Sequence, residues 1–157
     1  MKIKWKQLIL CVAIPLAVGG LSAFLTRDAM ESFEHLNQPP LSPPTWLFPV
    51  VWTILYILMG IGSYLVWNSG GRYSGERVKA LTVYAVQLAF NFLWTIVFFN
   101  LGWYLFAFVW LVALWGLILW TFLLFHRQSP PAGWMLLPYL AWVAFAGYLN
   151  FGIYLLN

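Results

Sequence analysis

Long apolar blocks alternate with short polar stretches along the whole chain. Each block is 21 to 23 residues long, and none contains Asp or Glu. A helix rises about 1.5 Å per residue, so about 20 residues cross the roughly 30 Å of hydrocarbon in a bilayer. The blocks are continuously apolar rather than alternating, which favours helices over the strands of a membrane barrel. The pattern therefore predicts five transmembrane helices, at residues 5–25, 46–67, 80–100, 103–125 and 134–156.

The composition argues against a soluble fold. Of the 157 residues, 63% are hydrophobic and only 8% are charged, whereas soluble domains are about 25% charged. In water such a chain would expose large apolar patches. We therefore expect an all-α membrane protein, a five-transmembrane-helix bundle that forms one domain over residues 1–157. The net charge of +4 is too small and too dispersed to indicate nucleic-acid binding.

Basic residues concentrate in the segments that five spans place on one side of the membrane. Arg27 is the only Lys or Arg on the opposite side. Because cytoplasmic loops carry the excess of Lys and Arg, we expect the N-terminus in the cytoplasm and the C-terminus outside, in a bacterial cell membrane. The basic residues on the cytoplasmic side are Lys2, Lys4, Lys6, Arg72, Arg77, Lys79 and Arg127.

The first block has a second interpretation. A basic start, an apolar run and small residues near Gly20 also describe a cleavable signal peptide. The block is longer than the apolar core of such a peptide, and Pro15, Gly19 and Gly20 suit helix packing. These features favour a retained span.

The first loop, residues 26–45, is the longest loop, and it lies on the outer side. Its first half predicts a short helix, with Asp28 as cap and Glu31 completing a capping box. Its second half has four prolines in six residues, which forbid helix and hold the chain extended. The segment is either a lid over the bundle or a rigid connector. The residues expected to form a lid are Phe33, Pro43, Pro44 and Trp46.

Polar and aromatic side chains recur at helical spacing on three of the predicted helices. The second helix carries Pro49, Trp52, Tyr56, Met59 and Ser63. The third carries Tyr84, Gln87, Asn91, Trp94 and Thr95. The fifth carries Tyr139, Trp142, Ala146, Leu149 and Asn150. Buried polar groups in lipid mark the bundle interior, so the three stripes are expected to face one another.

Two interpretations of these stripes remain open. The amides of Gln87, Asn91 and Asn150 suit interhelical hydrogen bonds. The same residues, with the indole rings, suit a pocket for a large, flat, mostly apolar ligand. Ordinary catalysis is disfavoured because no span contains a carboxylate and no metal, phosphate or serine-triad motif is present. We expect no metal site and no required cofactor.

Several segments resemble the translocator protein family (TspO/MBR, the peripheral-type benzodiazepine receptor). The resemblance covers nearly the whole chain and is weakest in the first and fourth spans. It is carried by PPTWLFPVVWTILY at residues 43–56, MGIGSYLVW at 59–67, QLAFNFLW at 87–94 and LPYLAW at 137–142.

The resemblance implies a homodimeric five-helix receptor or transporter with a pocket under the first loop. It implies tetrapyrrole ligands such as protoporphyrin IX and haem, and isoquinoline or benzodiazepine-type ligands. Two alternatives remain: light- and oxygen-dependent porphyrin degradation, with Trp52 and Trp142 as the reactive residues, and a ligand-sensing regulatory role. The expected ligand-binding residues are Trp52, Tyr56, Asn91, Trp94, Tyr139, Trp142, Ala146, Leu149 and Asn150.

The sequence departs from the family pattern in three places. No basic residue follows Tyr154, as the family's cholesterol motif requires, so strong cholesterol binding is not expected. The loop reads Pro40-Leu41 where many members have Trp. The third helix has Ala85 and Ala89 in place of glycine pairs; these small residues are the expected dimer face.

Overall fold

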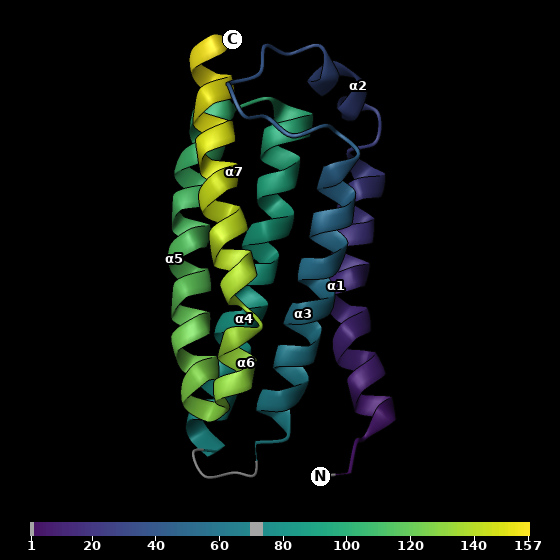
Figure 1. Cartoon of the computed structure of the whole chain (residues 1–157), viewed down its shortest axis with the longest axis vertical. Coiled ribbons are helices and arrows are strands. Elements are labelled where there is room, and N and C mark those ends of the chain that lie inside the picture. The colour runs from purple at the N-terminus through teal and green to yellow at the C-terminus, as the bar shows by residue number, and fades with distance from the viewer. Residues whose placement is uncertain (1, 70–73) are drawn as a thin grey trace.

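The computed structural model describes residues 2–69 and 74–157, and these residues form helices joined by short loops. Five helical segments are long and apolar enough to cross a membrane, which confirms the predicted all-α bundle (Figure 1). The long elements are α1 (Trp5–Leu25), α3 (Leu47–Trp67), α4 (Ser74–Thr95) with its π-helical extension η1 (Ile96–Leu101), α5 (Tyr104–Gln128) and α7 (Leu137–Leu156). Two short helices, α2 (Ala29–Glu34) and α6 (Pro130–Trp134), lie at opposite ends of the bundle.

Several helix boundaries differ from the predicted spans, and two of the differences have a clear physical reason. Helix α4 begins at Ser74 rather than at residue 80, because hydropathy detects only the part of a helix that lies in lipid. Glu76 in its first turn suits the positive end of the helix dipole. The predicted fifth span breaks at Met135 and Leu136, and α7 starts with Pro138 in its first turn, where a missing N–H costs nothing. Arg72 lies outside the described residues.

The short helix α2 forms where the sequence predicts a helix, but the expected capping box is absent. Asp28 occupies the N-cap position without a side-chain hydrogen bond to the helix. Its backbone angles are φ −73° and ψ −30°, which are helical, whereas a capping side chain reaches the first turn from an extended backbone. The preceding turn continues into α2 through the bond from Ala29 N–H to the Thr26 carbonyl, at 3.1 Å.

The helices pack pairwise through small residues and indole hydrogen bonds. A Cβ placed on Gly60 of α3 would lie 2.5 Å from the Val12 Cα of α1, so only glycine allows this approach. Trp110 of α5 donates its N–H to the Phe90 carbonyl of α4 at 2.9 Å. Trp115 of α5 donates to the Leu140 carbonyl of α7 at 3.0 Å. These contacts fix α5 between α4 and α7.

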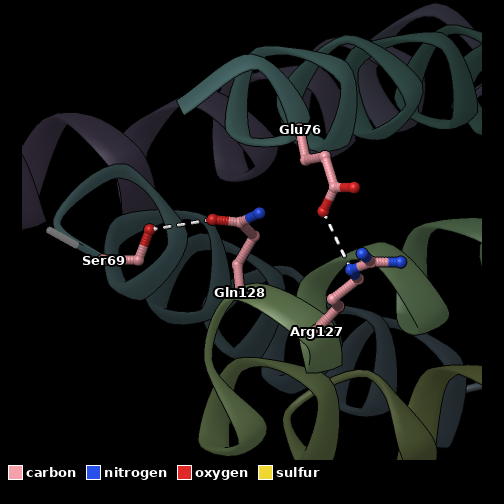
Figure 2. Close-up of polar contacts among 4 residues, drawn as sticks. All are labelled: Ser69, Glu76, Arg127 and Gln128. Carbon is pink, nitrogen blue, oxygen red and sulfur yellow. Dashed lines mark hydrogen bonds and ion pairs between the residues drawn. The ribbon is translucent and has the colours of Figure 1, made fainter. Parts of the chain in front are cut away.

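At the end of the bundle that carries the N-terminus, polar contacts join the helix ends (Figure 2). The Arg127 Nε of α5 lies 2.9 Å from a carboxylate oxygen of Glu76 on α4. The Ser69 hydroxyl, just after α3, donates to the Gln128 side-chain oxygen at 3.2 Å. These two contacts tie the end of α5 to both neighbouring segments.

The first loop folds over the opposite end of the bundle (Figure 1). We call this loop, residues 26–45, the lid. The chain reverses direction at a turn in which the Ser42 hydroxyl bonds the Pro39 carbonyl at 2.7 Å. Leu41 in this turn has φ +69°, a left-handed backbone that non-glycine residues rarely adopt. Pro39 is buried against α7, where it meets Gly152.

Candidate functional site

A cavity of about 350 Å³ lies inside the lid-side half of the bundle. Ligand sites commonly measure about 300–1,000 Å³ and are lined mostly by apolar side chains. Helices α1, α3, α4 and α7 supply its walls, and α2 with η1 covers it. The sequence-predicted residues in its wall are Trp52, Tyr56, Trp94, Trp142, Ala146, Leu149, Asn150 and Phe33.

Three indole rings give the cavity its flat walls. Trp52 of α3 stacks on Tyr56 at 5.7 Å between ring centroids. Trp142 of α7 meets Phe48 of α3 edge to face at 5.9 Å, which brings α3 and α7 together beside the cavity. Trp94 of α4 stacks on Phe98 at 5.2 Å. Flat apolar faces from three helices therefore surround one space.

The π-helical segment η1 brings two phenylalanines to the top of the cavity. Phe98 and Phe99 both line it, and their rings lie 5.9 and 5.3 Å from the Phe33 ring of the lid. A π-helix changes the phase of the helix by widening one turn, and such turns often occur at functional sites. The segment ends at Gly102, whose φ of +64° favours glycine.

A chain of buried hydrogen bonds forms the floor beneath the cavity. The Tyr56 hydroxyl donates to Asn91 at 2.8 Å, and the Asn91 amide donates to the Tyr139 hydroxyl at 2.6 Å. Tyr139 then donates to the Gln87 side-chain oxygen at 2.8 Å. Asn91 and Tyr139 were predicted to contact the ligand, but the structure places both below the cavity wall. There they position Tyr56, which does line it.

The amide of Asn150 is also occupied within the protein. Its side-chain oxygen accepts the Trp94 indole N–H at 3.0 Å, and its NH₂ group donates to the Tyr104 carbonyl at 2.8 Å. Asn150 therefore joins α4, α5 and α7 and also lines the cavity.

The indole N–H of Trp142 has a different environment. It is buried and has no hydrogen-bond partner among the described residues. Leaving a buried donor unpaired costs about 1–3 kcal/mol, and Trp142 lines the cavity. Neighbouring atoms enclose this N–H, so an acceptor on a ligand would reach it only if the Trp142 ring turned toward the cavity.

The lid residues divide into two groups. Phe33, one of the residues expected to form the lid, is buried and lines the cavity. Pro43, Pro44 and Trp46 lie outside the cavity wall as the structure describes it, and 65% of Trp46 is exposed. Pro44 is also exposed, whereas Pro43 is half-buried. Gln38 and Met30 contribute to the wall instead.

The sequence-based pocket omitted the first span, yet α1 forms one whole wall. Its residues there include two glycines and an alanine at a spacing of three and four. A stripe of small residues is the available signal, but it is equally typical of tight helix packing. The α1 residues in the wall are Leu16, Gly19, Gly20, Ser22, Ala23 and Thr26.

The cavity offers hydrophobic and hydrogen-bonding surface rather than charge. The wall residues identified in the described part of the chain include no Asp, Glu, Lys, Arg or His. Across residues 2–69 and 74–157, no three His, Cys, Asp or Glu side chains gather in a group able to hold a metal. The wall therefore combines aromatic and apolar surface with a few hydroxyl and amide groups.

These features define an integral, multi-pass helical membrane protein with a lidded aromatic cavity. The sequence profile described as the TspO/MBR family matches residues 11–156, and the chain belongs to that family. The bovine "Translocator protein" is 40% identical over 151 residues, covering 94% of this chain and 88% of the bovine protein.

Two bacterial relatives are similar over comparable lengths. The "Tryptophan-rich protein TspO" of Chlorobaculum tepidum is 42% identical over 151 residues, covering 96% of this chain and 95% of that protein. "Protein CrtK" of Rhodobacter capsulatus is 42% identical over 140 residues, covering 88% of this chain and 85% of that protein. Membership of this family supports a role as a membrane receptor or sensor.

Proposed function

We propose that the cavity is a receptor site for flat, largely apolar ring systems, above all tetrapyrroles such as protoporphyrin IX and haem. Smaller isoquinoline and benzodiazepine-type rings belong to the same class. The observation that carries this proposal is the placement of Trp52, Trp94 and Trp142 around one uncharged space. Aromatic rings of a ligand stack on such faces or meet them edge-on.

The hydrogen-bonding groups of the cavity restrict the ligand further. Trp94 uses its N–H on Asn150, and Tyr56 uses its hydroxyl on Asn91, so both offer mainly ring surface. Trp142 retains an unpaired N–H. A ligand with a carbonyl or carboxylate oxygen at one edge would pair this donor and remove its desolvation cost. Acceptor-free hydrocarbons of the same shape should bind more weakly.

The direct test is a porphyrin titration of the purified protein in lipid nanodiscs. Porphyrin should quench the tryptophan fluorescence of the wild-type protein, and binding should shift the porphyrin absorption band. Both changes should saturate as the porphyrin concentration rises. Trp142→Phe should weaken binding about tenfold, the equivalent of about 1.4 kcal/mol, because the ring remains and the N–H is lost. Trp103→Phe is the matched control, since Trp103 is exposed and lies outside the wall. Saturable binding that ignores Trp52→Ala, Trp94→Ala and Trp142→Ala would contradict the proposal.

A receptor or sensor differs from a transporter and from a degrading enzyme in what happens after binding. In the same nanodiscs, the absorbance of illuminated protoporphyrin IX should fall no faster with the protein present than in empty nanodiscs. In sealed liposomes, porphyrin should bind without accumulating in the lumen. A new product spectrum that disappears in Trp52→Phe and Trp142→Phe would favour degradation instead.

The proposed receptor sits in the membrane as a homodimer with its N-terminus in the cytoplasm. The exposed faces of Ala85 and Ala89 lie along α4, and their small size permits a close helix approach. Exposed Lys2, Lys4 and Lys6 lie at the end away from the lid, which agrees with the excess of basic residues on cytoplasmic sides. Ala89→Trp should convert the dimer to monomer in light scattering, whereas Trp at the exposed position Val109 of α5 should not.

A further inference from the structure

Five wall residues of the cavity are also exposed: Gln38 in the lid, and four residues on the membrane-spanning helices. Gly20 and Ala23 belong to α1, and Pro49 and Thr53 belong to α3. A residue that both lines a cavity and is exposed marks a place where the wall is open. The wall residues on α7, by contrast, are buried or half-buried.

The register between α1 and α3 places these four residues opposite each other. The antiparallel helices touch where Gly60 meets Val12, and again nearer the lid where Gly19 meets the Tyr56 ring. Nearer the lid, the next exposed wall residues on α1 are Gly20 and Ala23. On the antiparallel α3, the exposed wall residues that follow Tyr56 toward the lid are Thr53 and Pro49. The two pairs therefore form the two sides of one seam.

The tight contact between the helices ends at Gly19. A Cβ on Gly19 would clash with the Tyr56 ring, whereas a Cβ on the next residue, Gly20, would meet nothing within 4 Å. Gly20 is therefore not needed for helix packing in this structure. Its lack of a side chain leaves an open space at the seam.

The rim of this opening suits lipid rather than water. The Thr53 hydroxyl donates to the Pro49 carbonyl at 2.7 Å, and the side chains of Gly20, Ala23 and Pro49 carry no polar atom. In the hydrocarbon region every polar group must find a partner within the protein. The Thr53–Pro49 bond meets that condition for the only hydroxyl of the rim.

Specific contacts hold the lid and the floor in place at the two ends of the cavity. Asn157 clamps the lid by accepting the Asn37 backbone N–H at 3.1 Å and donating to the Asn37 carbonyl at 3.0 Å. Pro39 packs so closely on Gly152 that a Cβ there would lie 2.6 Å away. The hydrogen-bonded tyrosine and amide floor closes the opposite end.

From these observations we propose that the cavity has a side mouth between α1 and α3, in the half of the bilayer nearest the lid. Its rim is formed by Gly20, Ala23, Pro49 and Thr53. Apolar, membrane-dissolved ligands enter through it directly from the lipid, without opening the lid. This deepens the proposed receptor function by defining the route and the partition behaviour of its ligands.

Thiol labelling tests the mouth without any porphyrin. A cysteine at Ala146, which is buried on the α7 wall, is placed in a Cys11→Ser background and reconstituted in liposomes. A long-chain N-alkyl maleimide that partitions into lipid should label it at least tenfold faster than a charged, water-soluble methanethiosulfonate. Each rate is first normalised to Glu34→Cys, because Glu34 is exposed in the lid and is not a wall residue. Equal normalised rates for the two reagents would contradict the mouth.

Plugging the rim is the second arm of the experiment. Thr53→Trp, added to the Ala146→Cys protein, should slow labelling by the alkyl reagent at least tenfold. Leu21→Trp is the matched control, because Leu21 is exposed on α1 but is not a wall residue. Ala23→Phe is a second plug if Thr53→Trp does not fold as judged by size-exclusion chromatography. Unchanged labelling in a folded plug variant would overturn the proposal.

The experiments can reject the receptor proposal and the mouth proposal independently of each other. Fast, plug-sensitive alkyl labelling with no porphyrin binding would retain the mouth and reject the tetrapyrrole ligand. Porphyrin binding that depends on Trp142, together with plug-insensitive labelling, would retain the receptor and reject the mouth.

Discussion

The Trp94 indole N–H donates to the side-chain oxygen of Asn150 at 3.0 Å, and this bond ties α4 to α7 at the cavity wall. Since the second half of the same amide bonds the Tyr104 carbonyl of α5, Asn150 joins three helices. The cavity thus shares its wall with an interhelical bond, so changes here should alter stability as well as binding.

We expect Asn150→Leu to destabilise the bundle by about 1–2 kcal/mol, because both a buried N–H and a buried carbonyl lose their partner. Trp94→Phe removes the donor of one of these bonds and should lower the free energy of unfolding by less than Asn150→Leu does. Unfolding in mixed detergent micelles gives both values. The double variant Trp94→Phe/Asn150→Leu should show a coupling of about 0.5–1 kcal/mol. Strict additivity would mean that the bond contributes nothing to stability.

The hydrogen bonds in the floor of the cavity predict which of two tyrosine substitutions lowers stability more. Tyr139 both accepts from Asn91 and donates to Gln87, whereas Tyr56 only donates to Asn91. Tyr139→Phe should therefore destabilise by about 1–2 kcal/mol and Tyr56→Phe by about 0.5–1 kcal/mol. The measurement is again unfolding in mixed micelles. An equal or reversed order would show that the network is not organised around Tyr139.

The contact between α1 and α3 predicts opposite outcomes for two glycines. Gly60→Ala would place its Cβ 2.5 Å from the backbone of Val12, and relieving such overlap typically costs about 1–3 kcal/mol. Gly116→Ala on α5 meets nothing within 4 Å and should be neutral or stabilising by up to about 1 kcal/mol. Thermal unfolding of the two variants in one detergent compares them directly. A Gly60→Ala protein as stable as wild type would contradict the packing described here.

The ion pair at the end opposite the lid should contribute little. The Arg127 and Glu76 side chains are 60% and 37% exposed, and exposed pairs typically contribute less than about 1 kcal/mol. Glu76→Gln should therefore lower stability by less than about 1 kcal/mol at low salt, with a smaller effect at 1 M NaCl because salt screens the attraction. Unfolding at the two salt concentrations checks this. A large, salt-independent loss would point to a role beyond the ion pair.

The tryptophans of the cavity were predictable because helical periodicity identifies the face that turns inward. Trp52, Trp94 and Trp142 stand on such faces, and all three line the cavity. Periodicity does not give depth, however. Asn91 and Tyr139 share those faces but lie below the cavity, since they bond to each other and to the neighbouring tyrosine and glutamine.

The small residues of α1 show a second limit of the pattern. Gly19 and Gly20 are adjacent and chemically identical, yet one packs against Tyr56 and the other meets open space. A glycine allows close approach but does not specify whether a neighbour is there. Only the packing of α1 on α3 distinguishes the two, and with them the closed and open parts of the wall.

The pattern of apolar residues is enough to place this protein in lipid and to predict its helical architecture. Five long apolar blocks with few charges must lie in lipid, and in lipid a helix satisfies its own backbone. It also determined which helix faces turn inward, because polar groups avoid hydrocarbon. The tertiary structure decided where the interior is filled and where it is hollow, because a cavity is the space left when several helices meet. That is why α1, with Gly20 at its rim, joined the site only in three dimensions.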